Sequence, residues 1–272
     1  MIISKTQKIW ASVFFGVVYL GMSLTLFIQS AWKPSAENLL MFHFIFVLFI
    51  GYLAGMWIAF YTIPQTTLQS KVGKSLLFLG LGNLTMGAGF IAWFIMEIFM
   101  GIEDLYPSIA DVFYVLFVPF VIIGLIYLLR IYSLDITPRK IVRAAVTTIV
   151  ACALTYLFAH VTIPAFQSAE NFGKYVFDFF YAITDMVFVG MIVFVISLSG
   201  GRIYKGLWVY LAGLVLSIIA DFLFFYREDL GVHHIADVAD DFYLLSGCAL
   251  TLGIWYIAQS FSQNITDKSD VS

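Results

Sequence analysis

The chain has 272 residues, of which 62% are hydrophobic and only 11% are charged, and its formal net charge is −3 at pH 7. With a mean hydropathy of +0.97, this composition excludes an ordinary soluble domain and indicates a chain that lies mostly within a lipid bilayer. The pI of about 5.7 and the lack of a basic domain exclude a nucleic-acid-binding protein, so membrane lipids are the first expected partners.

Eight apolar runs follow one another along the chain, and each reaches the length of about 20 residues that a helix needs to cross a membrane. The first run is too long for a signal-peptide core, and Gln29-Ser30-Ala31 is a poor cleavage site. The sequence therefore predicts an all-α polytopic bundle of eight transmembrane helices. The runs lie at about 9–29, 39–62, 75–99, 108–132, 141–163, 175–198, 206–227 and 237–260.

The basic residues between these runs are distributed unevenly across the membrane. Of the 14 lysines and arginines, eleven fall on the side that holds both termini, whereas Lys33, Lys174 and Arg227 fall on the other. Cytoplasmic loops carry such an excess of positive charge. We therefore predict a multi-pass protein of the plasma membrane with both termini in the cytoplasm.

Two short segments, one in each half of the chain, repeat each other. Residues 109–116 read Ile-Ala-Asp-Val-Phe-Tyr-Val-Leu and residues 238–245 read Val-Ala-Asp-Asp-Phe-Tyr-Leu-Leu, with five of eight positions identical. A duplication of four spans predicts two halves in parallel orientation, related by a pseudo-twofold axis along the membrane normal. We assign residues 1–136 and 137–262 to the two four-helix repeats and residues 263–272 to a disordered cytoplasmic tail.

Each copy of the repeated segment has the features of a helix start. Ser108 and Asp111 are spaced as in a capping box, and Asp237 and Asp240 take the same places in the second copy. Acidic residues in a first turn also favour the helix dipole. Helix capping is therefore one explanation of the two repeated aspartates, and a functional role is the other.

The first copy belongs to a longer pattern, Tyr-Pro-Ser-Ile-Ala-Asp-Val-Phe-Tyr, which follows a span that ends near Trp93 and Glu97. This pattern resembles a motif of the multi-pass sensory domains that form the N-terminal membrane part of many prokaryotic histidine kinases and diguanylate cyclases. The resemblance covers residues 93–125 and, more loosely, residues 221–255, and it implies a sensory function. Because no output domain follows here, we expect a standalone form that signals through a cytoplasmic partner.

Ionisable residues inside the predicted spans gather in the C-terminal half. A charge at the centre of a bilayer costs about 2.5–3.5 kcal/mol on insertion scales, so such residues are candidates for function. Asp185 and Asp221 have no basic partner within any span, so we expect them to share a proton, bind a cation or face water. The spacing of Asp178, Tyr181 and Asp185 places them on one helix face.

These positions predict an outward-facing acidic cavity that binds a ligand. Its predicted lining residues are His160, Asp178, Tyr181, Asp185, Asp221, Asp240, Asp241 and Tyr243. Asp178 and Asp241 are also shallow enough for their side chains to reach the membrane interface without any ligand.

The sequence favours a sensor or ligand-binding protein and leaves two alternatives open. One is an intramembrane hydrolase that acts on a lipid through a metal or through paired carboxylates, with His233, His234 and Asp237 as candidate metal ligands. The other is a transporter coupled to protons or cations. The sequence identifies no cofactor and no catalytic residue. Helix faces rich in small residues, such as Gly51 with Gly55, can pack another helix or a second subunit in a homodimer.

Overall fold

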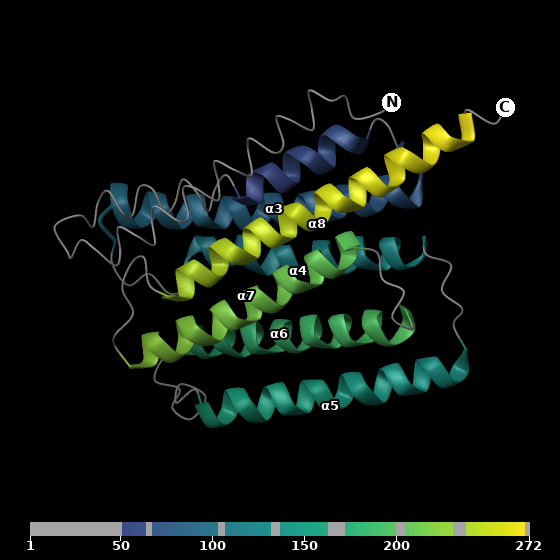
Figure 1. Cartoon of the computed structure of the whole chain (residues 1–272). Coiled ribbons are helices and arrows are strands. Elements are labelled where there is room, and N and C mark those ends of the chain that lie inside the picture. The colour runs from purple at the N-terminus through teal and green to yellow at the C-terminus, as the bar shows by residue number, and fades with distance from the viewer. Residues whose placement is uncertain are drawn as a thin grey trace.

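A computed structural model describes residues 51–63, 67–102, 107–131, 137–162, 172–199, 205–230 and 238–269. Every regular element within these ranges is a helix, which confirms the predicted all-α class (Figure 1). The elements are the helix Gly51–Ile63, α3 (Lys71–Phe94), the π-helix η1 (Ile95–Phe99), α4 (Ile109–Leu129), α5 (Pro138–Thr162), α6 (Phe172–Ser199), α7 (Lys205–Asp229) and α8 (Val238–Ser269). The predicted run at 9–29 and the first part of the run at 39–62 lie outside the described residues.

Five helices of the described chain are long and apolar enough to cross a membrane, which indicates a membrane protein. Each coincides closely with a predicted run, because an apolar stretch of about 20 residues is a property of the sequence itself. The apolar stretch within α5 is shorter, Ile141–Leu154, and the helix Gly51–Ile63 is also short. The five segments are Lys71–Phe94, Ile109–Leu129, Phe179–Ile196, Lys205–Arg227 and Val238–Ser260.

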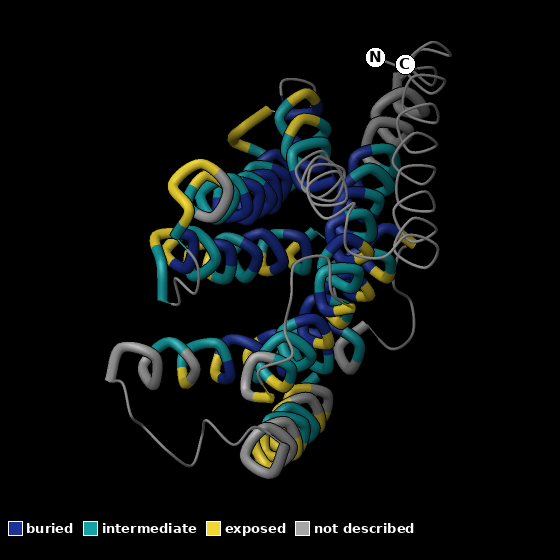
Figure 2. Tube along the Cα trace, turned by 90° about the vertical axis from the view of Figure 1, so that its left-hand side faces the viewer, coloured by how far each residue is buried: buried dark blue, intermediate teal, exposed yellow. Residues whose placement is uncertain are grey.

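The helices pack as consecutive pairs, with α3 beside α4, α5 beside α6 and α7 beside α8 (Figure 1). Helices joined by a short connection run in opposite directions, so each pair is antiparallel. The pairs meet through contacts of α8 with α3 and of α6 with α4 and α7. Most of the largest buried side chains lie in α3, α4, α7 and α8, whereas no residue of α5 whose burial is described is buried (Figure 2).

The α3–α4 pair and the α7–α8 pair pack in the same register. In the first pair Gly82 of α3 faces Val121 of α4, and in the second pair Gly213 of α7 faces Leu250 of α8. The shift in residue number from Val121 to Leu250 is the same as the shift between the two copies of the repeated segment. Small residues at these positions let the two helices of each pair approach closely.

The same register extends to a second glycine in each pair and to the end of the bundle at which Lys71, Lys74, Arg130 and Lys205 lie, which we call the basic end. Gly124 of α4 faces Leu79 of α3, and the matching Gly253 of α8 faces Tyr210 of α7. Beyond these, two lysines lie over tyrosine rings. Lys74 lies 5.6 Å from the ring centroid of Tyr127, and the matching Lys205 lies 4.4 Å from that of Tyr256.

The small-residue face of the helix Gly51–Ile63 packs against helices of the same chain. A Cβ atom at Gly55 would overlap Nδ2 of Asn83 in α3 and would lie 2.6 Å from Oγ1 of Thr251 in α8. Gly51 lies against the backbone of α8 at Cys248. This face therefore holds the helix between α3 and α8, and the predicted homodimer is not needed to explain it.

The end of α8 differs from the sequence prediction. The helix continues to Ser269, through most of the segment 263–272 that we predicted to be a disordered tail. Helix elongation adds one backbone hydrogen bond for each residue that is fixed, without a new nucleation step. No glycine or proline follows Gly253 in α8, so the sequence contains no local signal that ends the helix.

Candidate functional site

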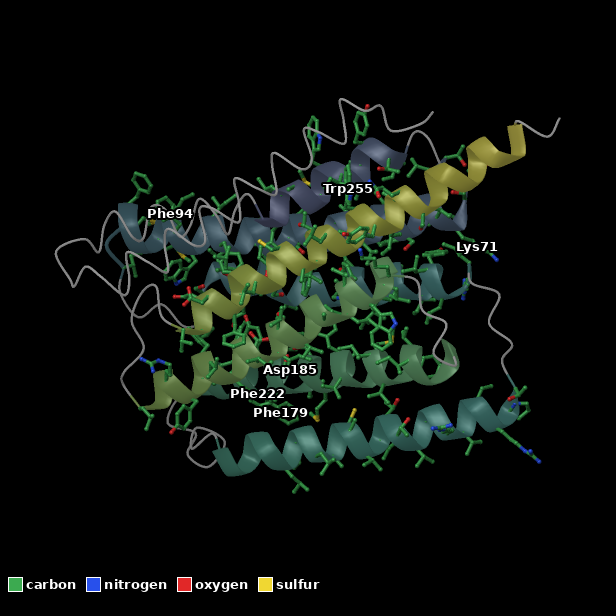
Figure 3. All side chains as sticks on the ribbon, in the orientation of Figure 1. Lys71, Phe94, Phe179, Asp185, Phe222 and Trp255 are labelled. Carbon is green, nitrogen blue, oxygen red and sulfur yellow. The ribbon has the colours of Figure 1, made fainter. Side chains whose placement is uncertain are left out.

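Two aspartates from neighbouring helices meet inside the bundle. Asp185 of α6 is only 3% exposed, and its side chain is in hydrogen-bonding contact with that of Asp221 of α7. Figure 3 shows Asp185 between α6 and α7, away from the end of α3 at which Lys71 lies. An ionised carboxylate can only accept hydrogen bonds, so two carboxyl groups bond to each other only if one of them carries a proton. Such a contact requires one proton shared between the two acids.

A tyrosine of the repeated segment completes this contact. The hydroxyl of Tyr243, on α8, donates a hydrogen bond to Oδ1 of Asp221. The Tyr52 hydroxyl, from the helix Gly51–Ile63, donates to the backbone oxygen of Tyr243 at 3.2 Å. Asp221 thus accepts a hydrogen bond from a tyrosine whose own backbone is held in place by a second tyrosine.

A third aspartate joins α6 to α4. The hydroxyl of Tyr181 donates to Oδ1 of Asp111 at 2.6 Å, and Asp111 is 5% exposed. Oδ2 of the same carboxyl accepts from the backbone nitrogen of Ser108 at 2.5 Å, and Ser108 Oγ accepts from the backbone nitrogen of Ala110. These bonds confirm the predicted capping box at the start of α4. Asp111 therefore caps its own helix and also binds a tyrosine of another helix.

An aromatic ring of α3 packs among the tyrosines near the acids. The ring of Phe90 lies 5.5 Å from that of Tyr52, 5.4 Å from that of Tyr114 and 6.0 Å from that of Tyr243. Tyr114 and Tyr243 occupy the same position of the repeated segment. Such edge-on and tilted ring contacts favour a fixed arrangement of the hydroxyl groups. We call Asp111, Tyr181, Asp185, Asp221 and Tyr243 the acidic cluster.

A second polar group lies deeper in the bundle and fits a structural role. Nδ2 of Asn83 donates to the backbone oxygen of Tyr52 at 3.3 Å and to Oγ1 of Thr251 at 3.4 Å. The hydroxyl of Thr251 donates in turn to the backbone oxygen of Gly51. Interhelical hydrogen bonds of this kind hold membrane helices together, which explains these residues without a ligand.

The structure brings together four of the predicted lining residues: Tyr181, Asp185, Asp221 and Tyr243. Asp240 lies in the first turn of α8 and interacts electrostatically with Tyr114, and Asp241 follows it. His160 lies in α5 and Asp178 in α6, but their side chains are outside the described part of the structure.

The three candidate metal ligands, His233, His234 and Asp237, also lie outside the described residues. Within the described ranges, no group of three or more histidine, cysteine, aspartate or glutamate residues is arranged to hold a metal ion.

Asp111 is the member of the acidic cluster that is not among the predicted lining residues. The capping box accounts for Asp111 locally, so its contact with Tyr181 on another helix was not predicted. One signal was available, because the repeated segment aligns Asp111 with Asp240, which we placed in the site. The site therefore includes a residue from the predicted N-terminal half and does not belong to the C-terminal half alone.

The acidic cluster can exchange a proton, or bind a cation in place of that proton. Its three carboxyl groups have hydrogen-bond donors around them, namely two tyrosine hydroxyls and a backbone N–H. Comparison with protein-family models, with curated proteins and with solved structures found no match for this chain.

Proposed function

We propose that this protein is an integral membrane sensor that binds a small cationic ligand at the acidic cluster. The ligand class comprises protons, inorganic cations and amines. One observation supports this most strongly: three carboxyl groups lie close together, with Asp111 and Asp185 buried and Asp221 half-buried, and no basic side chain among the described residues contacts any of them. Uncompensated negative charge in a medium of low dielectric constant attracts a proton or a cation.

The proposal includes a topology of eight spans in two parallel four-helix repeats. It places the protein in the plasma membrane, with both termini in the cytoplasm. The shared register of the α3–α4 and α7–α8 pairs supports the repeat. The basic residues Lys71, Lys74, Arg130 and Lys205 lie at helix ends away from the acidic cluster, which supports an outward-facing cluster under the positive-inside rule.

The sensor interpretation also draws on the resemblance of residues 93–125 to multi-pass sensory domains. The acidic cluster joins α4, α6, α7 and α8, so a ligand that binds there changes the contacts between three helix pairs. A ligand that binds one arrangement more tightly shifts the population towards it. A cytoplasmic partner would detect this shift at the opposite ends of the same helices.

Ligand binding is testable on the full chain in lipid nanodiscs. Thermal unfolding is measured at one fixed pH with sodium, potassium, calcium, a primary amine and a quaternary ammonium ion. A second series varies the pH alone and tests the proton as the ligand. A ligand present at about 100 times its Kd stabilises the folded state by about 2.7 kcal/mol, so the midpoint should rise in the wild type. The rise should be absent in Asp221→Asn.

Thr184→Val is a matched control for that experiment. Thr184 is buried next to Asp185 on α6, and its hydroxyl donates to the backbone oxygen of Tyr181 in its own helix at 2.8 Å. The variant alters a buried polar group of the same helix without altering a carboxyl, so it should respond as the wild type does. The proposal is wrong if the midpoint of thermal unfolding responds to every cation and to pH in the same way in the wild type and in Asp221→Asn.

The two alternative functions have less support from the described residues. A metal-dependent hydrolase needs a group of ligands that the described part of the chain does not contain. A transporter needs a polar path to the basic end, but the α3–α4 pair is filled there by the fully buried Leu76, Leu79, Leu125 and Leu128.

A further inference from the structure

Among the described residues, the α5–α6 pair contacts the rest of the bundle through a narrow interface. α5 lies at the edge of the bundle and packs against α6 (Figure 1). α6 in turn makes limited contacts with α4 and α7, whereas the contacts within the α3–α4 and α7–α8 pairs are extensive. Movement of the α5–α6 pair against the other helices therefore breaks fewer contacts than movement within the other two pairs.

The side-chain contacts that hold α6 to α4 and α7 include four between described residues. Two are aromatic, with the ring of Phe188 5.7 Å from that of Phe117 and the ring of Tyr181 5.6 Å from that of Phe225. The other two are polar and belong to the acidic cluster: Tyr181 with Asp111, and Asp185 with Asp221. Of these four contacts, only the one between the two acids requires a proton that can be lost to water.

Loss of that proton would place two negative charges side by side in the interface. Like charges in contact at low dielectric constant repel strongly, and separation relieves the repulsion. No basic group among the described residues stands close enough to compensate the second charge. Among the described residues, the titratable groups around the pair, from α4, α6, α8 and the helix Gly51–Ile63, are Tyr52, Asp111, Tyr114, Tyr181 and Tyr243, and Asp240 of α8 interacts in turn with Tyr114.

We propose that the proton shared by Asp185 and Asp221 docks the α5–α6 pair onto α4 and α7, and that loss of this proton releases the pair. The device is a pH-sensitive switch at a helix interface. It rests on the proposed function for the case in which the ligand is a proton, and it adds the position of the α5–α6 pair as the response to that ligand.

The direction of the pH dependence follows from proton linkage. The docked state binds one more proton than the released state, so docking is strongest at low pH and weakens as the pH rises. The bond from Tyr181 to Asp111 uses the hydrogen of the phenol itself, so it supports docking without contributing to this transition. An increase of docking with rising pH would contradict the proposed direction.

Distances between spin labels on α5 and α7 test the switch directly. Val150 and Trp208 are 52% and 43% exposed, so labels at Val150→Cys and Trp208→Cys replace exposed side chains. The background carries Cys152→Ala and Cys248→Ala, which removes the two native thiols. Double electron–electron resonance in lipid nanodiscs should give one narrow distance at low pH and a second, longer population at high pH.

Asp185→Asn is the decisive variant. An asparagine amide donates a hydrogen bond to Asp221 without a proton that can be lost, so this variant should show the short distance at every pH. Asp221→Asn should also show the short distance at every pH, and it replaces Asp185→Asn in the test if that variant does not fold. The proposal is overturned if the wild-type distance distribution does not change with pH, or if the change persists in both variants.

Tyr181→Phe separates the switch from simple weakening of the interface. It removes the hydrogen bond to Asp111 and leaves both members of the acid pair in place. The longer distance should be more populated at every pH, while a transition with pH remains. If the transition is lost in Tyr181→Phe but kept in Asp185→Asn, the controlling proton belongs to the Tyr181–Asp111 contact, and the proposal is wrong.

Discussion

The α3–α4 pair and the α7–α8 pair share one packing scheme and differ at one end. Their glycines and lysines occupy matching positions, and so do the tyrosines of the repeated segment. In the first pair Tyr114 packs its ring against Phe90, whereas in the second Tyr243 donates a hydrogen bond to Asp221. Phe90 and Asp221 are matching positions, because the shift in residue number that relates them also relates Gly82 to Gly213.

This difference separates scaffold from chemistry. A tyrosine one turn inside α4 or α8 is part of the shared scaffold, because it occurs in both pairs. The partner on the preceding helix decides what that tyrosine does. Phe90 makes it part of an aromatic core, and Asp221 makes it a hydrogen-bond donor to an acid that also contacts Asp185. Only the second arrangement can bind a proton or a cation.

The largest expected effect concerns the two matching positions themselves. Phe90→Ala removes a ring that contacts three tyrosines, and such truncations cost about 3–5 kcal/mol of unfolding free energy. Asp221→Ala leaves the hydroxyl of Tyr243 unpaired and should cost less, about 1–3 kcal/mol. Unfolding in mixed micelles measures both values. A greater loss in Asp221→Ala would mean that the acid, and not the ring, stabilises the bundle.

A smaller effect is expected where the two pairs differ in how closely their helices approach. A Cβ atom at Gly253 would lie 2.7 Å from backbone atoms of Tyr210, whereas at the matching Gly124 the two nearest atoms belong to the Leu79 side chain. A backbone cannot give way as a side chain can, so Gly253→Ala should cost about 1–3 kcal/mol and Gly124→Ala less. The same unfolding measurement compares the two, and equal losses would show that the two pairs are equally tightly packed.

The smallest expected effect compares the two tyrosines. Tyr243→Phe removes the hydrogen bond to Asp221 and should cost about 1–2 kcal/mol, in the range of hydrogen bonds between membrane helices and to acidic groups. Tyr114→Phe keeps the ring contact with Phe90 and should change stability by less than about 0.5 kcal/mol. Comparable losses in the two variants would indicate that the hydroxyl of Tyr114 also has a structural partner.

Parts of the candidate site were predictable because they follow from local patterns. Apolar runs fixed the approximate bounds of the helices, and the spacing of Ser108 and Asp111 predicted the capping box. The sequence also placed Asp185 and Asp221 in one predicted acidic cavity, because both lie within apolar spans without a basic partner. The contact between Tyr181 and Asp111 was not predictable in this way, because it depends on how α4 and α6 pack against each other.

The sequence by itself determined that the chain is helical, that five described helices are long and apolar enough for a membrane, and that a short segment is repeated. These features depend on hydropathy and on the order of neighbouring residues, which are local. Only the tertiary structure decided that Phe90 and Asp221 occupy matching positions and that Asp111 joins the acidic cluster. Those facts depend on register and packing between helices, where a shift by a single position turns a side chain by about 100° around its helix.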